Sequence, residues 1–280
     1  MIKRILVVLD ADGDTPVATR YAIDIARRHG AELTGLALVD TASIEASTRG
    51  GGIGSMYLAE TLKDELTKEA RAVAHKLTNS FRESAGEAGV VARAQTDEGT
   101  PLHRIAEDTK YHDLMVLGKV PHLFYSHPNQ QTLTIQALLK ETVGTTLVVT
   151  ERYTPVRRVL IAYDDSAQSA LALRTLVHLR PFGSDNTIDI VNVHKRNRSA
   201  ESGHALEKAH SYLRAHGMEA NAVSIQSDNP FDAIVESATQ YGADLLVLGV
   251  HVVAPLMKLT FGSTTASFLD SVPVPLWLGN

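Results

Sequence analysis

The sequence contains two copies of one pattern, and this repeat limits the fold more than any other feature of the chain. Three segments of the first half recur in the same order in the second half: KRILVVLD (3–10) as RRVLIAYD (157–164), PLHRIAEDTKYHDLMVLG (101–118) as PFDAIVESATQYGADLLVLG (230–249), and TTLVVT (145–150) as VPLWLG (274–279). A repeat of this length predicts two domains of similar structure. We place their boundary in the polar stretch ERYTP, so the expected domains are residues 1–152 (copy one) and 153–280 (copy two).

Within each copy, short apolar runs alternate with segments of helical periodicity. In copy one, strands are predicted for the runs ILVVL, ELTGLALVD, GVVARAQ, DLMVLG and TTLVVT. Helices are predicted between them, around residues 17–25, 62–81, 101–111 and 132–142. On the second of these helices the side chains expected to share one apolar face are Leu62, Leu66, Val73, Leu77 and Phe81. Strands separated by helices predict a parallel sheet covered on both faces, so we expect two open five-stranded α/β domains of the Rossmann-like class.

Composition excludes several classes of function. The net charge of −5 provides no basic field, so nucleic acid is not an expected partner. Apolar runs stay well below the roughly 18–20 residues that cross a bilayer, and the N-terminal run is too short for a signal peptide, so we expect no membrane partner. The chain has no cysteine, which excludes disulfides, thiol catalysis and cysteine-bound zinc and fits a cytoplasmic location.

The stretch GVHVVAPLMKLTFGST (249–264) lies where a parallel sheet binds ligands, because it follows the fourth predicted strand of copy two. Glycine at positions 249 and 262 allows backbone N–H groups to approach a phosphate, and the helix expected to begin at Gly262 and Ser263 offers unpaired N–H donors. The chain contains neither a Walker A loop nor a GxGxxG string. This stretch is therefore the candidate nucleotide loop.

The spacing of this stretch resembles the loop Gly-x2-Gly-x9-Gly-(Ser/Thr) of the universal stress protein family. The resemblance covers both copies, through the aspartate after the first strand, the glycine after the fourth strand and the final strand, so the chain is similar to a tandem universal stress protein. It implies an adenine-nucleotide alpha-hydrolase-like fold, with the two domains paired along TTLVVT and VPLWLG as an intramolecular pseudo-dimer and with a homodimer as a further option. It also implies a stress-response role in ligand binding and signalling rather than catalysis, with ATP or another adenine nucleotide, and Mg²⁺ accompanying it, in copy two.

The resemblance also implies which residues hold the nucleotide. Asp164 would lie near the adenosine, and the backbone of Val193 would meet the adenine. The ribose and phosphates would be lined by Gly249, Gly262, Ser263 and Thr264, with Val252 at the position of the family's second glycine. In copy one Pro121 stands at that second glycine and Gln131 at the third, so we expect a degenerate loop that does not bind nucleotide.

Plainer interpretations exist for each of these residues. Gly249 can simply end a strand, Ser263 can cap a helix, and Asp10 and Asp164 can be solvated turn residues. Asp113 and Asp244 precede the fourth strand of each copy and are expected to form turns rather than a site.

Two other functions remain open at this level. The sequence LDADGDT resembles the nucleophile loop of haloacid-dehalogenase phosphatases, with Asp10 as nucleophile and Asp12 as proton shuttle, although Asp14 stands where threonine or valine is usual. Alternatively, the apolar stretch 250–261 covers a non-nucleotide ligand, either apolar or a metal. The histidines placed to bind a metal are His122, His127, His194 and His251, but their spacing defines no metal motif, so no metal residue is predicted.

Overall fold

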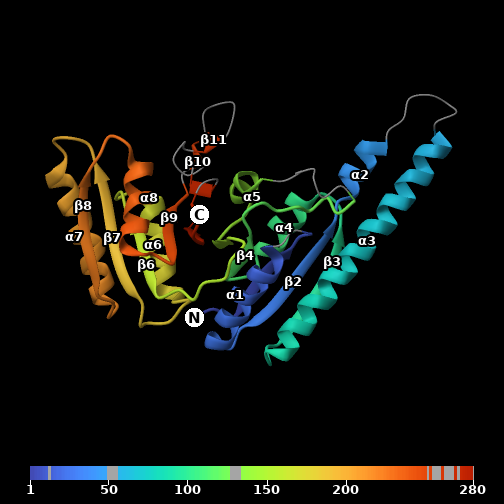
Figure 1. Cartoon of the computed structure of the whole chain (residues 1–280), viewed down its shortest axis with the longest axis horizontal. Coiled ribbons are helices and arrows are strands. Elements are labelled where there is room, and N and C mark those ends of the chain that lie inside the picture. Colours follow the sequence, from blue (N-terminus) through green and yellow to red (C-terminus); the bar gives the residue numbers. More distant parts are fainter. Residues whose placement is uncertain are drawn as a thin grey trace. The chain divides into compact units, whose positions relative to one another are not determined.

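The computed structural model describes residues 1–11, 14–48, 56–126, 134–250, 252–253, 260–261, 268–269 and 272–279. The chain divides into two compact units, one of residues 3–143 and one of residues 1–2 and 144–280. Figure 1 labels most of the helices and strands of both. Each unit is described separately below.

The unit of residues 3–143 is a parallel sheet with the strand order β3-β2-β1-β4. Its elements in chain order are β1 (Arg4–Leu9), α1 (Asp14–His29), β2 (Glu32–Val39), α2 (Thr41–Thr48), α3 (Met56–Glu87), β3 (Ala92–Glu98), α4 (Pro101–Thr109), β4 (Leu114–Gly118) and α5 (Ile135–Glu141). The predicted strands and helices of this part of copy one are confirmed, and α2 is an additional helix that the periodicity did not indicate. The central strands β1 and β4 are almost fully buried, as expected for a sheet with helices on its faces.

The long helix α3 buries a different face from the predicted one. Leu62 is 43% exposed, and of the predicted apolar face only Phe81 is fully buried. The other buried side chains of this helix are smaller, and they are spaced three or four residues apart with Phe81: Ala70, Ala74, Thr78 and Ala85. The Phe81 ring occupies the space where Gly35 of β2 has no side chain, 2.6 Å from the point where a Cβ atom on this glycine would lie. The helix packs closely against the strand, and most of its buried positions therefore hold small residues. A prediction based on large apolar residues alone does not detect this buried face.

The unit that contains residues 144–280 has the strand order β5-β12-β9-β6-β7-β8. Its elements are β5 (Thr145–Val149), β6 (Arg158–Ala162), α6 (Ala167–Leu179), β7 (Thr187–His194), α7 (Ser199–Ala215), β8 (Ala220–Gln226), α8 (Pro230–Tyr241), β9 (Leu245–Gly249), β10 (Val252–Val253), β11 (Thr260–Phe261) and β12 (Leu276–Gly279). The strands β12, β9, β6, β7 and β8 are parallel, which confirms the five-stranded sheet predicted for copy two.

The strand β5 pairs with β12 in the antiparallel direction, with Trp277 opposite Leu147. The predicted pairing of TTLVVT with VPLWLG is therefore confirmed. Trp277 is completely buried, and its indole Nε1 donates a hydrogen bond to Thr175 of α6 at 3.2 Å. Although β5 belongs to copy one in the sequence, its contacts place it in the compact unit of copy two. The sequence boundary after residue 152 stays a prediction.

Asp113 and Asp244 each lie in a bend just before the fourth strand of their copy, where each ties that strand to the first one. The carboxylate of Asp113 accepts hydrogen bonds from two backbone N–H groups at the start of β1, at 2.7 and 3.0 Å. Asp244 accepts the corresponding pair at the start of β6, at 3.0 Å each. Both aspartates thus lie at the amino ends of the first strands, away from the carboxyl ends where ligands bind.

Within the described ranges, no helix combines the length and apolar character that crossing a membrane requires.

Candidate functional site

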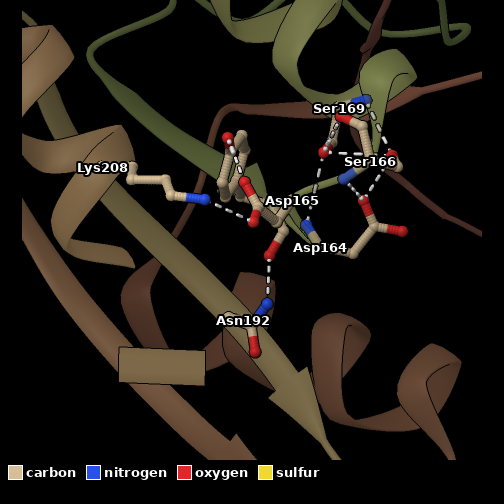
Figure 2. Close-up of polar contacts among 7 residues, drawn as sticks. Asp164, Asp165, Ser166, Ser169, Asn192 and Lys208 are labelled. Atoms are coloured by element: carbon tan, nitrogen blue, oxygen red, sulfur yellow. Dashed lines mark hydrogen bonds and ion pairs between the residues drawn. The ribbon is translucent and has the colours of Figure 1, made fainter. Parts of the chain in front are cut away.

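The turn between β6 and α6 carries the first predicted site residue, Asp164. Its carboxylate accepts hydrogen bonds from the backbone N–H and the hydroxyl of Ser166, at 3.1 and 2.5 Å. Ser166 in turn caps α6 by accepting from the N–H of Ser169 at 3.1 Å (Figure 2). Asp165 has a positive φ of 61°, a conformation that aspartate tolerates better than most residues. The turn therefore presents Asp164 as an exposed carboxylate at the carboxyl end of β6.

Two neighbouring elements fix this turn. Lys208 of α7 forms an ion pair with Asp165 at 3.0 Å, and the hydroxyl of Tyr163 donates to the same carboxylate at 3.3 Å (Figure 2). Burial, reinforced by the charge of Asp165, raises the pKa of Tyr163 to about 12. From β7, the buried side chain of Asn192 donates to the carbonyl oxygen of Tyr163 at 2.7 Å.

Val193, the second predicted site residue, is half-buried at the end of β7. The N–H of Thr187 donates to the carbonyl of Arg157, just before β6. Along a strand, the N–H groups of successive residues point to opposite sides. Val193 is an even number of residues from Thr187, so its N–H also faces the β6 side. The ladder between the two strands ends at the pair of Ala162 with Val191. The N–H of Val193 therefore points past the end of β6, toward the turn that holds Asp164.

Two adjoining cavities open at this point, and they share Asp164, Val193 and Pro230 in their walls. The first has a volume of about 280 Å³ and is lined mainly by apolar groups, among them Val191, Ile234, Leu248 and Phe268. The second has a volume of about 780 Å³, and its lining includes the polar residues Asn192, His194, Lys195, Arg198, Ser202 and His204. The structure thus places Asp164, Val193 and Gly249 in the lining of the smaller cavity.

Gly249 has a structural role that is independent of any ligand. A side-chain Cβ at this position would lie 2.4 Å from the backbone nitrogen of Ser169 and 2.5 Å from the carbonyl carbon of Gln168. Glycine is thus required because the first turn of α6 passes directly over the end of β9, which supports the plainer interpretation of this residue.

We predicted a loop after Gly249. This prediction is wrong for residues 252–253 and 260–261, which form two short strands. Val252 and Val253 form β10, which pairs in the antiparallel direction with Phe261 and Thr260 of β11. Valine favours the extended backbone of a strand, whereas glycine is depleted in strands. The predicted residues Gly262, Ser263 and Thr264 lie outside the described residues.

In copy one the equivalent position is covered by a tyrosine. The strand registers of the two units match, so Leu38 is the counterpart of Val193 and Leu9 the counterpart of Tyr163. The N–H of Leu38 donates to the hydroxyl of Tyr125 at 3.1 Å, and this hydroxyl donates to the carbonyl oxygen of Leu9 at 2.5 Å. Burial raises the pKa of the Tyr125 phenol well above its ordinary value.

The aspartate proposed from the sequence as a phosphatase nucleophile lies beneath this covered region. Asp10 is 1% exposed, and its carboxylate accepts a hydrogen bond from the Thr15 hydroxyl at 2.8 Å. Its counterpart Asp164 is exposed. A buried carboxylate does not meet a phosphate ester in solution, so the structure does not favour Asp10 as a nucleophile. Asp12 lies outside the described residues.

The candidate metal ligands do not form a cluster in the described part of the chain. His194 lines the larger cavity, with its Nδ1 atom 2.9 Å from the carbonyl oxygen of Lys195. His122 lies in copy one, in the segment that follows β4, and its carbonyl oxygen accepts from the N–H of Ala11 at 3.3 Å. Where the structure describes the chain, no three histidine, aspartate or glutamate side chains could hold one metal ion. His127 and His251 are not among the residues described.

The sequence analysis did not identify two residues at the ends of the first strands, Asn192 in copy two and Tyr125 in copy one. Asn192 is a buried polar residue between two valines of β7, TIDIVNVH, and that contrast is a usable signal for a side chain with a specific partner. Tyr125 ends the apolar triplet Leu-Phe-Tyr after β4 of copy one, where a solvated loop would be polar. Three consecutive buried residues in a connection indicate a segment that packs into the domain rather than over it.

Comparison with known proteins gives consistent results for the whole chain. The sequence model of the universal stress protein family matches residues 1–126 and 155–278, which are the two copies of the repeat. A universal stress protein of Synechocystis sp. is 25% identical over 289 aligned positions, which cover 98% of this chain and 99% of that protein.

Solved structures with low sequence identity share the fold. A universal stress protein from Archaeoglobus fulgidus matches with a TM-score of 0.71 at 17% identity, over 99% of this chain and 98% of that one. The protein PA1789 from Pseudomonas aeruginosa, described as functionally unknown, matches with a TM-score of 0.64 at 16% identity, over 99% of this chain and 92% of that one.

Proposed function

This chain belongs to the universal stress protein family, and on that premise we propose that it is a stress-response signalling protein that binds one adenine nucleotide in copy two. The observation that carries this proposal is the N–H of Val193, which points past the end of β6 beside a largely apolar cavity of about 280 Å³. Ligand pockets usually have volumes of about 300–1,000 Å³, so this cavity suits the adenosine part of a nucleotide, and the adjoining cavity extends it.

The lining of the smaller cavity matches the chemistry of adenosine. Val191, Ile234 and Phe268 offer apolar surfaces for a flat ring, and the N–H of Val193 offers a hydrogen bond to a ring nitrogen. Asp164 is an exposed carboxylate at the mouth, suited to accept hydrogen bonds from the ribose hydroxyls. The phosphates would then continue toward Gly249, and the family resemblance implies Gly262, Ser263 and Thr264 as further phosphate-binding residues.

Binding is expected to be weak for ATP. The described walls of the larger cavity carry three acidic residues, Asp164, Asp165 and Glu201, against the two basic residues Lys195 and Arg198, and Arg198 is already paired with Glu201. Little positive charge is left in these walls to compensate a triphosphate, so ATP would depend on Mg²⁺ and on backbone N–H groups. Val252 is paired in β10, so the backbone at this position is less free to adapt to the phosphates than it would be with the family's glycine.

A non-nucleotide ligand is a second candidate because the larger cavity, of about 780 Å³, exceeds what adenosine requires. Its mixture of Asn192, Ser202 and two histidines would suit a polar ligand with several hydrogen-bonding groups rather than an apolar one.

A matched pair of substitutions tests the nucleotide proposal. Titration calorimetry with AMP and with Mg²⁺-ATP should give one site per chain, and Asp164→Asn should weaken it about tenfold or more, because a hydrogen bond to a charged group contributes roughly 1.5–3 kcal/mol. Asp10→Asn alters the equivalent buried residue of copy one and should leave the nucleotide affinity unchanged.

Mass spectrometry of the gently purified protein separates the two candidate ligands. A retained adenine nucleotide supports the proposal, whereas a different retained molecule supports the second candidate. If neither AMP nor ATP binds the parent protein at millimolar concentration, the nucleotide proposal fails. Magnesium-dependent hydrolysis of a generic phosphate ester that is lost in Asp10→Asn would instead support the phosphatase alternative.

A further inference from the structure

The segment of residues 119–126 lies over the carboxyl ends of β1 and β2 in copy one, and we call it the strap. Hydrogen bonds attach it at several points along its length: Lys119 N to Asp14 at 3.2 Å, Ala11 N to the His122 carbonyl at 3.3 Å, Leu38 N to the Tyr125 hydroxyl at 3.1 Å, and the Ser126 hydroxyl to the Leu66 carbonyl at 2.9 Å. Leu123, Phe124 and Tyr125 are all buried. The strap is therefore an integral part of the domain.

The Tyr125 ring takes the place that copy two leaves open. Its hydroxyl bridges the N–H of Leu38 and the carbonyl of Leu9, which are the counterparts of the N–H of Val193 and the carbonyl of Tyr163. In copy two the carbonyl is satisfied by Asn192 instead, and Val193 borders both cavities. Copy one has Ala37 at the position of Asn192, so no side chain from β2 competes with the phenol.

A buried carboxylate lies at the place where β4 ends. Asp14, at the start of α1, is 4% exposed and accepts a hydrogen bond from the N–H of Lys119, the first residue after β4. A Cβ atom on Gly118 would lie 2.6 Å from the Cβ of Asp14, so the glycine leaves room for this carboxylate. Copy two has the uncharged Gln168 at the corresponding position.

We propose that the crevice of copy one is a binding site for a planar ring with a hydroxyl group at its edge, and that Tyr125 fills it as an internal ligand. Phenols are the class of ligand that this site takes when the side chain is absent. The Tyr125 side chain is buried there, and its hydroxyl alone satisfies two backbone groups, one donor and one acceptor. An apolar cavity left by a removed ring can bind a small aromatic molecule, and the two polar groups add selectivity.

The test removes the Tyr125 side chain by mutation and adds a small phenol of the same shape to the solution. Tyr125→Ala should bind 4-methylphenol, measured as a concentration-dependent rise in Tm and by titration calorimetry, whereas the parent protein should not. Toluene has the same shape without the hydroxyl, and it should bind about tenfold more weakly because the two backbone groups then stay unsatisfied.

The neighbouring residue provides the matched control. Phe124→Ala also removes a buried ring from the strap, but the Tyr125 hydroxyl still occupies the two backbone groups, so this variant should not prefer 4-methylphenol over toluene. The proposal is overturned if folded Tyr125→Ala binds neither compound, or binds both equally.

Two further variants guard against a failure to fold. Ala37→Asn combined with Tyr125→Ala introduces the asparagine of copy two and should satisfy the Leu9 carbonyl while leaving the Leu38 N–H open for the phenol. Tyr125→Phe keeps the ring, and hydrogen exchange of the Leu38 amide should become about tenfold faster in it. An unchanged exchange rate would overturn the proposal without any cavity variant. None of these results depends on whether copy two binds a nucleotide.

Discussion

At the scale of single residues, the two copies meet the same backbone requirement in different ways. A carbonyl at the end of the first strand needs a donor in both, and it receives the phenol of Tyr125 in copy one and the amide of Asn192 in copy two. The phenol also covers the neighbouring N–H, whereas the amide does not. This single exchange leaves one crevice filled and places the Val193 N–H beside open space in the other.

The burial of Tyr125 predicts a pH dependence of stability. Its pKa is raised in the folded protein, so the neutral phenol is favoured by folding, and this contribution is complete below pH of about 10, the ordinary pKa of tyrosine. Above that pH the unfolded state loses the proton first, and the contribution is lost as the pH rises toward the folded-state pKa. Urea unfolding between pH 8 and pH 11, an interval of about three pH units, should therefore show a steeper loss for the parent than for Tyr125→Phe.

The same comparison gives a magnitude at neutral pH. Tyr125→Phe leaves two buried backbone groups without the hydroxyl and should lower the free energy of unfolding by about 1–3 kcal/mol. Tyr163 also has a raised pKa, and because it is present in both proteins its contribution cancels in the difference. Equal pH slopes in the two proteins would show that the phenol of Tyr125 does not stay protonated through this range.

At the scale of elements, close contacts between helices and strands decide where small residues stand. The first turn of α6 lies against Gly249 at the end of β9, and Ala172 in the next turn lies 2.6 Å from where a Cβ of Gly279 would be. In the other unit, Phe81 of α3 fills the space beside Gly35. These positions accept no larger residue because backbone or buried ring atoms already occupy the space.

A pair of glycine substitutions tests this reading of the packing. Gly249→Ala should lower the free energy of unfolding by about 1–3 kcal/mol or more, because the new Cβ meets the α6 backbone. Gly203 lies inside α7 with nothing within 4 Å of a Cβ, so Gly203→Ala should raise stability by about 0.5–1 kcal/mol. Chemical denaturation of both variants measures the two effects, and a neutral Gly249→Ala would contradict the close approach of α6 and β9.

At the scale of the whole molecule, the final strands of the two copies are joined. β12 is hydrogen-bonded on one side to β9 and on the other to β5, a strand that the sequence assigns to copy one. Without β5, the short apolar strand Leu276–Gly279 would be an open sheet edge, which is a template for pairing with another chain.

Two fragments of the chain test the role of this strand. The fragment 144–280 keeps β5, and we expect it to be monomeric in analytical ultracentrifugation. The fragment 153–280 follows the sequence boundary and lacks β5, so it should self-associate or aggregate through β12. Identical sedimentation of the two fragments would indicate that β5 does not protect the edge.

Much of the fold was predictable from the sequence because it depends on local and repeated patterns. The alternation of apolar strands and amphipathic helices, together with the repeat, led to two α/β units with parallel strands. The pairing of the final strands followed from the resemblance to the universal stress protein family. Asp113 and Asp244 were recognised as turn residues because each precedes a buried strand. The buried face of α3 was not predictable, because it depends on how closely Gly35 lets the helix approach.

The sequence by itself determined the family, the topology and the positions of Asp164, Val193 and Gly249 at the carboxyl ends of the strands. It also predicted that copy one differs from copy two, from the proline and glutamine at two glycine positions. Only the tertiary structure decided how they differ. The hydroxyl of Tyr125, 116 positions away from Leu9 in the sequence, donates a hydrogen bond to the carbonyl oxygen of Leu9 at the end of β1. A hydrogen bond between residues so distant in the chain has no local pattern, because it exists only after the strap has packed over the folded sheet.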